Sequence, residues 1–113
     1  MDLSIQKDTL YGIPRLRIEG MLMDHSVFWF SRELKALCGS NAPKVIVELT
    51  DTEFVDSHGL GMLVYHHNEL SRQGRTLIVL NANKDPDSYI RGLFNTSGLE
   101  RVLTVAARPE DVI

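Results

Sequence analysis

The sequence predicts an α/β protein: a mixed β-sheet with covering helices, in the order β-β-α-β-α-β-α-β. Near the start, two segments alternate between apolar and polar residues, which is typical of paired strands. Later, residues 44–49 and 76–80 form short apolar runs, as expected of strands buried on both faces. The segments between and around these runs have apolar residues at helical spacing, so parallel strand–helix–strand units are expected.

Size and composition indicate one globular domain spanning residues 1–113. The chain is 43% hydrophobic and 24% charged, with a net charge of −3 and no basic stretch, which argues against nucleic acid as a partner. Its single cysteine, Cys38, permits no internal disulfide. The first residues lack a secretion-signal pattern, and no apolar run is long enough for membrane insertion. We therefore expect a cytoplasmic protein.

The first two strands are expected to form a hairpin. Leu3 and Ile5 belong to the first strand, Leu16 and Ile18 alternate with polar residues in the second, and a polar connection at residues 7–12 joins them. The second strand is expected to end at a glycine, Gly20.

A first helix follows, with Asp24 or Ser26 as its N-cap, and it is expected to run to about Cys38 and stop at Gly39. Its inward stripe consists of apolar residues at helical spacing. These are Val27, Phe30, Leu34 and Leu37.

The second helix is expected over residues 57–73, between the two buried strands, with Gly74 as its C-terminal stop. Its core stripe consists of Leu60, Leu63, Val64 and Leu70.

A polar loop at residues 81–85 leads to a third helix, with Pro86 in or near its first turn. The helix is expected to end at Gly98 in a left-handed C-cap, followed by the apolar contact of Leu99. The helix's apolar face consists of Tyr89, Ile90, Leu93 and Phe94, and a last short strand contains Val102, Leu103 and Val105. The tail, residues 108–113, is expected to add a turn of helix.

A corner motif at residues 54–61, Phe-Val-Asp-Ser-His-Gly-Leu-Gly, is the most informative feature of the sequence. Ser57 is placed at the N-cap of the second helix or next to it. Free backbone N–H groups and the helix dipole favour a negative group there. Ser57 is therefore a plain cap or a hydroxyl that accepts a phosphate, and the two roles are compatible. Asp56 is expected to bond nearby backbone N–H groups.

The corner motif, the element order and a second segment, Leu-Phe-Asn-Thr-Ser-Gly-Leu at residues 93–99, resemble the STAS domain. This family is named for sulfate transporters and anti-sigma-factor antagonists. The family's Asp-Ser-Ser-Gly-Leu corner matches residues 56–60, and the resemblance covers nearly the whole chain. It implies a STAS-like fold.

The resemblance also implies a role as an anti-sigma-factor antagonist, or anti-anti-sigma factor, in transcription regulation and signal transduction. In the family, the first serine after the aspartate is phosphorylated, and that serine is Ser57 here. The implied partners are an anti-sigma factor with serine-kinase activity, which the unphosphorylated form sequesters, and a phosphatase that resets the switch. This role requires no catalytic activity of the chain and no cofactor.

Two alternatives remain open. The first is a non-phosphorylated STAS subunit of a transport or signalling assembly. It is favoured by His58, which replaces the family's second serine, and by Met23, which stands where the family often has an acid. The second is a small-ligand or nucleotide-binding STAS domain that uses the helix terminus at Ser57 as an anion site. No glycine-rich phosphate loop of the usual spacing supports it.

Histidines of the second helix do not indicate an enzyme or a metal site. Ser57 and His58 are neighbours on a helix and do not face each other, which argues against a nucleophile–base pair. His66 and His67 are adjacent and cannot bind one ion together, and His66 with Glu69 supplies only two ligands.

The expected partner surface centres on Ser57. Met62 and Tyr65 lie off the core stripe, on the flank of the helix that they share with His58. The residues assigned to this surface are Asp24, Asp56, His58, Met62 and Tyr65. In the first helix, three aromatic residues in succession, Phe28 to Phe30, exceed what one inward face can hold. One of them is therefore expected to be exposed or to cover the loop at residues 21–24.

Overall fold

The structure is a computed structural model that describes residues 3–113. Its strands are β1 (Leu3–Leu10), β2 (Ile13–Leu22), β3 (Lys44–Glu48), β4 (Thr52–Val55), β5 (Thr76–Leu80) and β6 (Thr104–Ala106). Its helices are α1 (His25–Cys38), α2 (Ser57–Arg72) and α3 (Tyr89–Ser97), with 3-10 turns η1 (Leu99–Arg101) and η2 (Pro109–Val112). The predicted α/β class is confirmed, with one strand, β4, added to the expected order.

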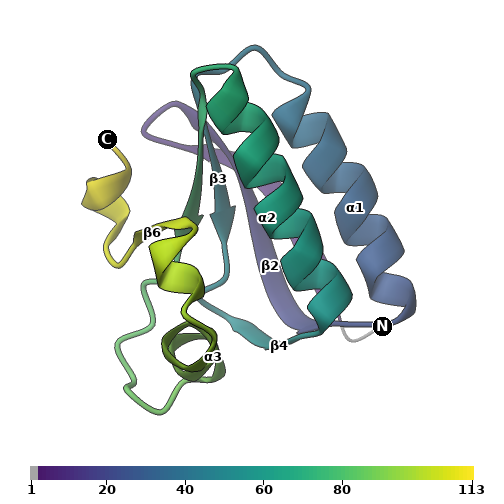
Figure 1. The fold of residues 1–113 in the computed structure, drawn as a ribbon, viewed down its shortest axis with the longest axis vertical. Helices are drawn as coiled ribbons and strands as arrows, with labels where there is room; N and C mark the ends of the chain where they lie inside the picture. The colour runs from purple at the N-terminus through teal and green to yellow at the C-terminus, as the bar shows by residue number, and fades with distance from the viewer. Residues whose placement is uncertain (1–2) are drawn as a thin grey trace.

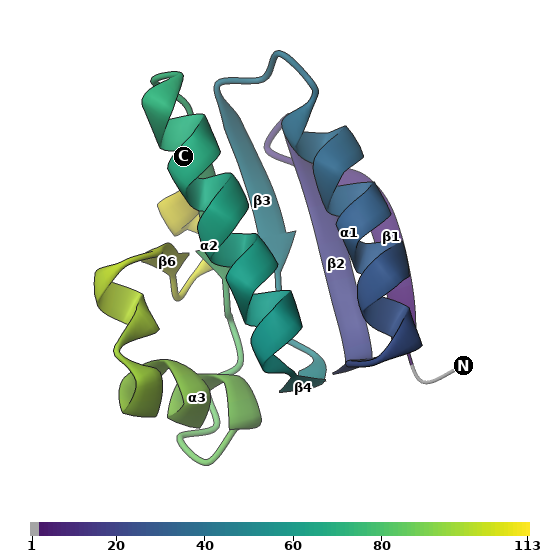
Figure 2. The ribbon, with the colours of Figure 1, turned by 45° about the vertical axis from the view of Figure 1, so that its right-hand side comes forward.

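The sheet is mixed, in the spatial order β1-β2-β3-β5-β6, and β4 pairs with the distal part of β2. β1 and β2 are antiparallel, whereas the pairs β2–β3, β3–β5 and β5–β6 are parallel. The expectation that residues 44–49 and 76–80 form adjacent parallel strands joined by the second helix is confirmed. Helices α1 and α2 lie side by side over one face of the sheet (Figures 1 and 2). Both helices return from parallel strands, so their N-termini lie at the same end of the molecule (Figure 2).

The main core lies between this face and the two helices. It combines apolar side chains of the strands with the inward stripes of α1 and α2, including Phe30, Leu34, Leu63 and Leu70. A smaller cluster on the other face contains Ile46, Ile78, Leu80, Ala106 and Val112, and η2 contributes the last of these. Within residues 3–113 no helix is long and apolar enough to cross a membrane.

The hairpin is tighter than the sequence indicates. The expected polar connection at residues 7–12 is strand up to Leu10, and only Tyr11 and Gly12 form the turn between paired Leu10 and Ile13. Both turn residues have positive φ, 51° and 77°, as the type I′ turns favoured in two-residue hairpins require. The strands' regular backbone pairing therefore outweighs the polar composition of this segment.

Gly20 does not end β2. The strand continues to Leu22, and the pairing with β4 shifts register between Gly20 and Met21, as in a β-bulge. Gly20 has a φ of 98°, which only glycine adopts readily, and this conformation redirects the strand toward the corner motif.

The third helix begins later than expected. Pro86 lies in a turn before it, and the N-cap is Ser88, whose hydroxyl accepts a hydrogen bond from the Arg91 N–H at 3.4 Å. Gly98 forms the expected left-handed C-cap, with φ 72°. In the last strand, Val102 and Leu103 precede the paired residues, which begin at Thr104.

Candidate functional site

The corner motif joins β4 to α2, and its aspartate caps the helix. Asp56 is the N-cap: its Oδ1 accepts a hydrogen bond from the Gly59 N–H at 2.8 Å. Ser57 is the first residue of the helix and is exposed. Of the two positions expected for Ser57, the one next to the cap is therefore correct. The structural role expected for Asp56 is confirmed, and it leaves the Ser57 hydroxyl free of the capping task.

Gly59 lets α2 start close against the sheet. A Cβ atom at this position would lie 3.0 Å from Val55 Cγ1 and 3.1 Å from Leu22 Cδ2. Both of those side chains are buried. These distances are shorter than ordinary van der Waals contact, so a larger residue here would have to displace both side chains by a few tenths of an ångström. Packing therefore favours glycine at this position.

The N-termini of α1 and α2 are linked through Asp56. Its Oδ2 accepts a hydrogen bond from the Asp24 N–H at 3.3 Å. Asp24 occupies the N-cap position of α1 with φ 53° and makes no side-chain cap. Ser26, the other expected cap, accepts a hydrogen bond from the Met23 N–H at 2.8 Å and holds the loop instead. The loop that carries Met23 and Asp24 is thus fixed beside the corner motif, as the expected partner surface requires.

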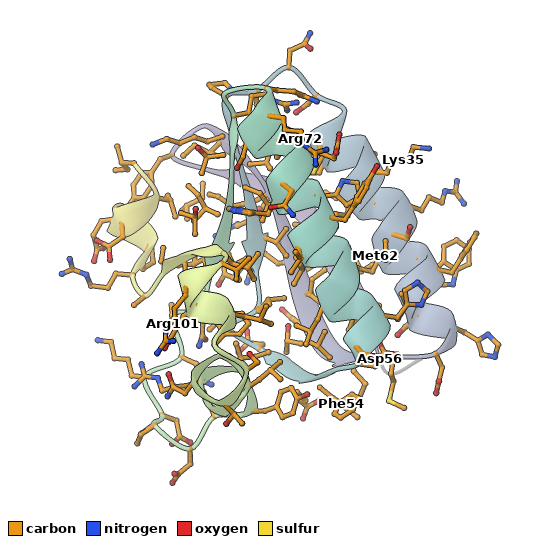
Figure 3. The ribbon with its side chains drawn as sticks, viewed as in Figure 1. Lys35, Phe54, Asp56, Met62, Arg72 and Arg101 are labelled. Carbon is orange, nitrogen blue, oxygen red and sulfur yellow. The ribbon has the colours of Figure 1, made fainter. Side chains whose placement is uncertain are left out.

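A groove runs between α1 and α2 from this corner, with a volume of about 550 Å³. Its lining residues are Ser31 and Lys35 of α1 and Ser57, His58, Gly61, Met62, Tyr65 and His66 of α2. Figure 3 shows Met62 and Lys35 on the two helices, with Asp56 at the end where α2 begins. The structure brings together four of the predicted site residues, Ser57, His58, Met62 and Tyr65, in one groove. Asp24 and Asp56 lie at its end, where the N-termini of the two helices meet.

The two α1 residues, Ser31 and Lys35, were not expected from the sequence. Both are polar residues on a helix surface, and a polar surface position carries no signal of which neighbour it faces. The packing of α1 against α2 decides which neighbours Ser31 and Lys35 face. It places Lys35 close enough to His66 for its charge to act there. Burial lowers the pKa of His66; Glu69 opposes that shift and Lys35 adds to it.

Exposed aromatic side chains lie on both helices. Tyr65 is 60% exposed, Phe28 is 63% exposed and Trp29 is 46% exposed, whereas Phe30 is fully buried. Phe28 and Trp29 contact each other edge to face at 5.3 Å between ring centroids. Two of the three successive aromatics are therefore exposed, where one was expected.

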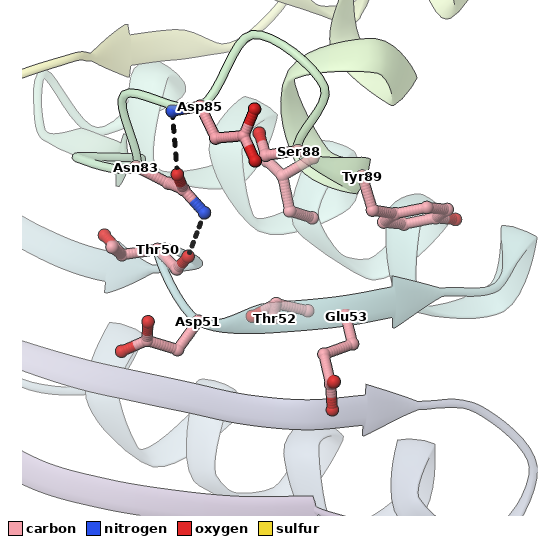
Figure 4. Close-up of a pocket in the computed structure, with 9 residues that line it drawn as sticks. Thr50, Asp51, Thr52, Glu53, Asn83, Asp85, Ser88 and Tyr89 are labelled. Carbon is pink, nitrogen blue, oxygen red and sulfur yellow. Dashed lines mark hydrogen bonds between the residues drawn. The ribbon is translucent and has the colours of Figure 1, made fainter.

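A second, polar cavity of about 420 Å³ lies beside β4 and the loop before α3 (Figure 4). Asn83 Nδ2 donates to the Thr50 carbonyl at 3.4 Å, and Asn83 Oδ1 accepts from the Asp85 N–H at 3.0 Å. Three carboxylates, of Asp51, Glu53 and Asp85, line the cavity. Negative charge repels a phosphate group, so this cavity is a poor site for a nucleotide. The nucleotide-binding alternative concerns a different place, the helix terminus at Ser57.

Metal-ligating residues do not cluster in the described part of the chain. Among residues 3–113, no group of three His, Cys, Asp or Glu side chains could hold a metal ion. His66 and Glu69 are three residues apart on α2, and within residues 3–113 no third ligand forms a group with them.

Comparison with known proteins identifies the family. A family model of the STAS domain matches residues 4–112, and the chain therefore belongs to the STAS domain family. A search of curated protein sequences found no significant match.

Solved structures with the same fold include anti-sigma factor antagonists. One from Mycobacterium paratuberculosis has a TM-score of 0.81 at 16% identity, over 97% of this chain and 90% of that one. The antagonist SpoIIAA in its unphosphorylated form has a TM-score of 0.72 at 22% identity, over 96% and 93% of the two chains. Bacillus SpoIIAA in its phosphorylated form has a TM-score of 0.66 at 22% identity, over 96% of each. At these identities the likeness is one of fold.

Proposed function

We propose that this STAS domain is an anti-sigma-factor antagonist, switched by phosphorylation of Ser57. The observation that carries the proposal is the position of Ser57: an exposed hydroxyl at the first residue of α2, at the end of the groove between α1 and α2. The fold shared with antagonists, among them SpoIIAA solved in both phosphorylation states, supports it. The chain then acts in the cytoplasm as a protein-binding module, without a catalytic activity or cofactor of its own.

The proposed switch is electrostatic. Phosphorylation adds about −1.5 to −2 charges at neutral pH, and at Ser57 they would stand beside the Asp56 carboxylate. The N-terminus of α2 stabilises this charge by about 0.3–1 kcal/mol when it is exposed to water. A partner that covers Ser57 removes that water, and burying an uncompensated charge is far more costly. The modified domain therefore stays folded and releases its partner, and a phosphatase reverses the change.

Incubation with a serine-kinase anti-sigma factor and ATP tests the modification. We expect one added phosphate, located on Ser57 by mass spectrometry, and none on Ser57→Ala. Ser26 and Ser97 are internal controls, because both hydroxyls are occupied by hydrogen bonds to backbone carbonyls. Phosphate on either of them in the wild-type protein would contradict the assignment.

The partner surface is proposed to centre on Ser57 and to include Asp24, Asp56, His58, Met62 and Tyr65. Ser57→Asp and Met62→Lys are both expected to weaken binding of the anti-sigma factor at least tenfold, since each places a charge in the covered area. Wild-type binding by both variants would exclude a switch of this kind.

The alternative is a STAS subunit of a transport or signalling assembly that is not phosphorylated. His58 and Met23 favour it, because both depart from the antagonist pattern at the site itself. The two functions differ in whether Ser57 is modified. The antagonist has a kinase that phosphorylates Ser57 and loses its partner when this happens, whereas the alternative subunit has no kinase that acts on Ser57 and stays bound to its partner in the presence of ATP.

A further inference from the structure

The groove between α1 and α2 has an uneven charge. Among the described residues, 3–113, its lining includes Lys35, His58 and His66 but no Asp or Glu. Lys35 is exposed, and within residues 3–113 it makes no ion pair. The carboxylate nearest in sequence to His66, that of Glu69, is paired with Arg72. Burial lowers the pKa of His66, so the full positive charge of the lining is that of Lys35, and the carboxylates of Asp24 and Asp56 lie only at the groove's end. The part of the groove beside Lys35 is therefore complementary to a negatively charged group.

The α2 side of the groove also contains a glycine that the fold itself does not require. Gly61 is exposed in the interior of α2, and a Cβ atom there would meet nothing within 4 Å. A helical glycine has lower stability than alanine at the same position. Because no contact within the chain explains Gly61, the space above its Cα is free for a group from outside. At Gly59, only two residues earlier, a Cβ atom would by contrast lie close against Val55 and Leu22.

The shape of the groove selects a helix as its occupant. Ser57, Gly61 and Tyr65 lie four residues apart on one flank of α2, and this flank extends for about 12 Å at 1.5 Å per residue. The walls are helices, whose backbone groups are already hydrogen-bonded, so they offer no edge to an extended peptide. A helix satisfies its own backbone groups and is the element that packs into such grooves. Met62 and Tyr65 supply the apolar surface that an amphipathic helix needs.

We propose that this groove binds an amphipathic helix with an acidic flank, belonging to the partner protein. Its apolar face packs on Met62 and Tyr65, its backbone passes close to Gly61, and a carboxylate reaches Lys35. This inference rests on the proposed function, since it names the partner element that the Ser57 surface recognises. Phosphate on Ser57 then repels the same acidic helix, which strengthens the release.

Two helical peptides with the same apolar face test the charge preference, one with Glu and one with Lys along its polar flank. Titration of the isotope-labelled protein followed by NMR should show shifts at Lys35, Gly61 and Tyr65 with the acidic peptide, and at least tenfold weaker binding of the basic peptide. Lys35→Glu should reverse this preference. Arg32→Glu is the matched control, because Arg32 is on the same helix but does not line the groove, and it should behave as wild type. Equal binding of both peptides, or shifts on the opposite face of the sheet, would overturn the proposal.

Gly61→Ala gives a second, independent test. It should raise the midpoint of thermal unfolding by about 3–6 °C through helix propensity. It should also lower the affinity for the acidic peptide at least fivefold, because the added methyl group blocks close approach of the peptide backbone. A more stable variant with unchanged peptide affinity would contradict the inference.

The peptide tests are separate from the test of function. If they fail while Ser57 is phosphorylated and Ser57→Asp releases the anti-sigma factor, the switch stands and only the helical occupant is wrong. If they succeed while no kinase modifies Ser57, the groove stands and the unphosphorylated alternative is favoured.

Discussion

At the scale of single residues, the two glycines of the corner motif are expected to respond oppositely to the same substitution. Gly59→Ala should lower stability, because overpacking against Val55 and Leu22 costs about 1–3 kcal/mol, more than the gain of up to about 1 kcal/mol from helix propensity. Gly61→Ala is the matched control and should raise stability. Urea unfolding of both variants measures the difference. Equal stability would show that α2 can move away from the sheet without loss.

Cys38 is expected to be an unreactive thiol. Burial raises its pKa to about 11, and the nearby Arg75 guanidinium offsets only part of that shift. A thiol reacts as its thiolate, so alkylation at pH 8 should be slower in the folded protein than in the protein unfolded by urea.

The sign of the pH effect on stability follows from the same raised pKa. Below the unfolded-state pKa of 9.0 the thiol is protonated in both states and its contribution is intact. As the pH rises from 9 toward 11, the unfolded chain loses this proton first, so the free energy of unfolding falls. The free energy of unfolding, measured against pH for wild type and Cys38→Ser over this range, isolates the effect. Parallel curves for the two proteins would contradict it.

The site could be predicted from the sequence where a residue type and its position in an element decide the outcome. Asp56 and Ser57 are both good capping residues, so the sequence alone did not decide between them. In the structure α2 begins at Ser57, and Asp56 is its N-cap. Met62 and Tyr65 were found because apolar residues off a core stripe are unusual. Lys35 could not be found in this way, because its role depends on the packing of α1 beside α2.

At the scale of elements, the first hairpin contains a turn residue that is poorly suited to its conformation. Tyr11 has φ 51° and is 58% exposed, so its side chain adds little packing. Asparagine adopts such backbone angles more readily and is preferred before glycine in type I′ turns. Tyr11→Asn is therefore expected to raise the free energy of unfolding by about 0.5–1 kcal/mol, the order of a backbone conformational effect. Tyr11→Val should lower it, and a gain from both would exclude the turn as the cause.

Strand β4 shows what the sequence pattern could not reveal. It has only four residues, too few for a clear alternation, and it pairs with β2 rather than with its sequence neighbour β3. Its first residue, Thr52, is buried and donates its hydroxyl to the Ile18 carbonyl at 2.7 Å. Buried apolar runs such as those of β3 and β5 were predictable because their length and composition leave few other structures. A buried polar residue such as Thr52, whose hydroxyl is satisfied by one hydrogen bond, looks like any surface residue in the sequence and does not indicate a strand.

At the scale of the whole molecule, the fold gathers its candidate functional groups at one end and along one side. Two parallel crossovers place the N-termini of α1 and α2 together, and Asp56 bonds to the backbone of both helices there. The α3 helix is tied to the same corner from the other side, since the Tyr89 hydroxyl donates to the Val55 carbonyl at 3.1 Å and its ring stacks on Phe54. The corner is therefore held by contacts from the N-termini of α1, α2 and α3, while Ser57 stays exposed.

A double-mutant cycle on partner binding tests whether Ser57 and the groove form one interface. Ser57→Asp and Met62→Lys should each weaken binding of the anti-sigma factor. The double variant should lose less binding free energy than the sum of the two single losses, with a coupling of about 0.5–3 kcal/mol. The reason is that the two changes disrupt the same contact and introduce opposite charges. Arg101→Glu is the control, because Arg101 is exposed on η1, away from the groove in Figure 3. Its effect with Ser57→Asp should be additive within about 0.5 kcal/mol. Additive losses for Ser57→Asp and Met62→Lys, measured by calorimetric titration, would show that the two residues contribute independently to partner binding and would contradict a single coupled interface.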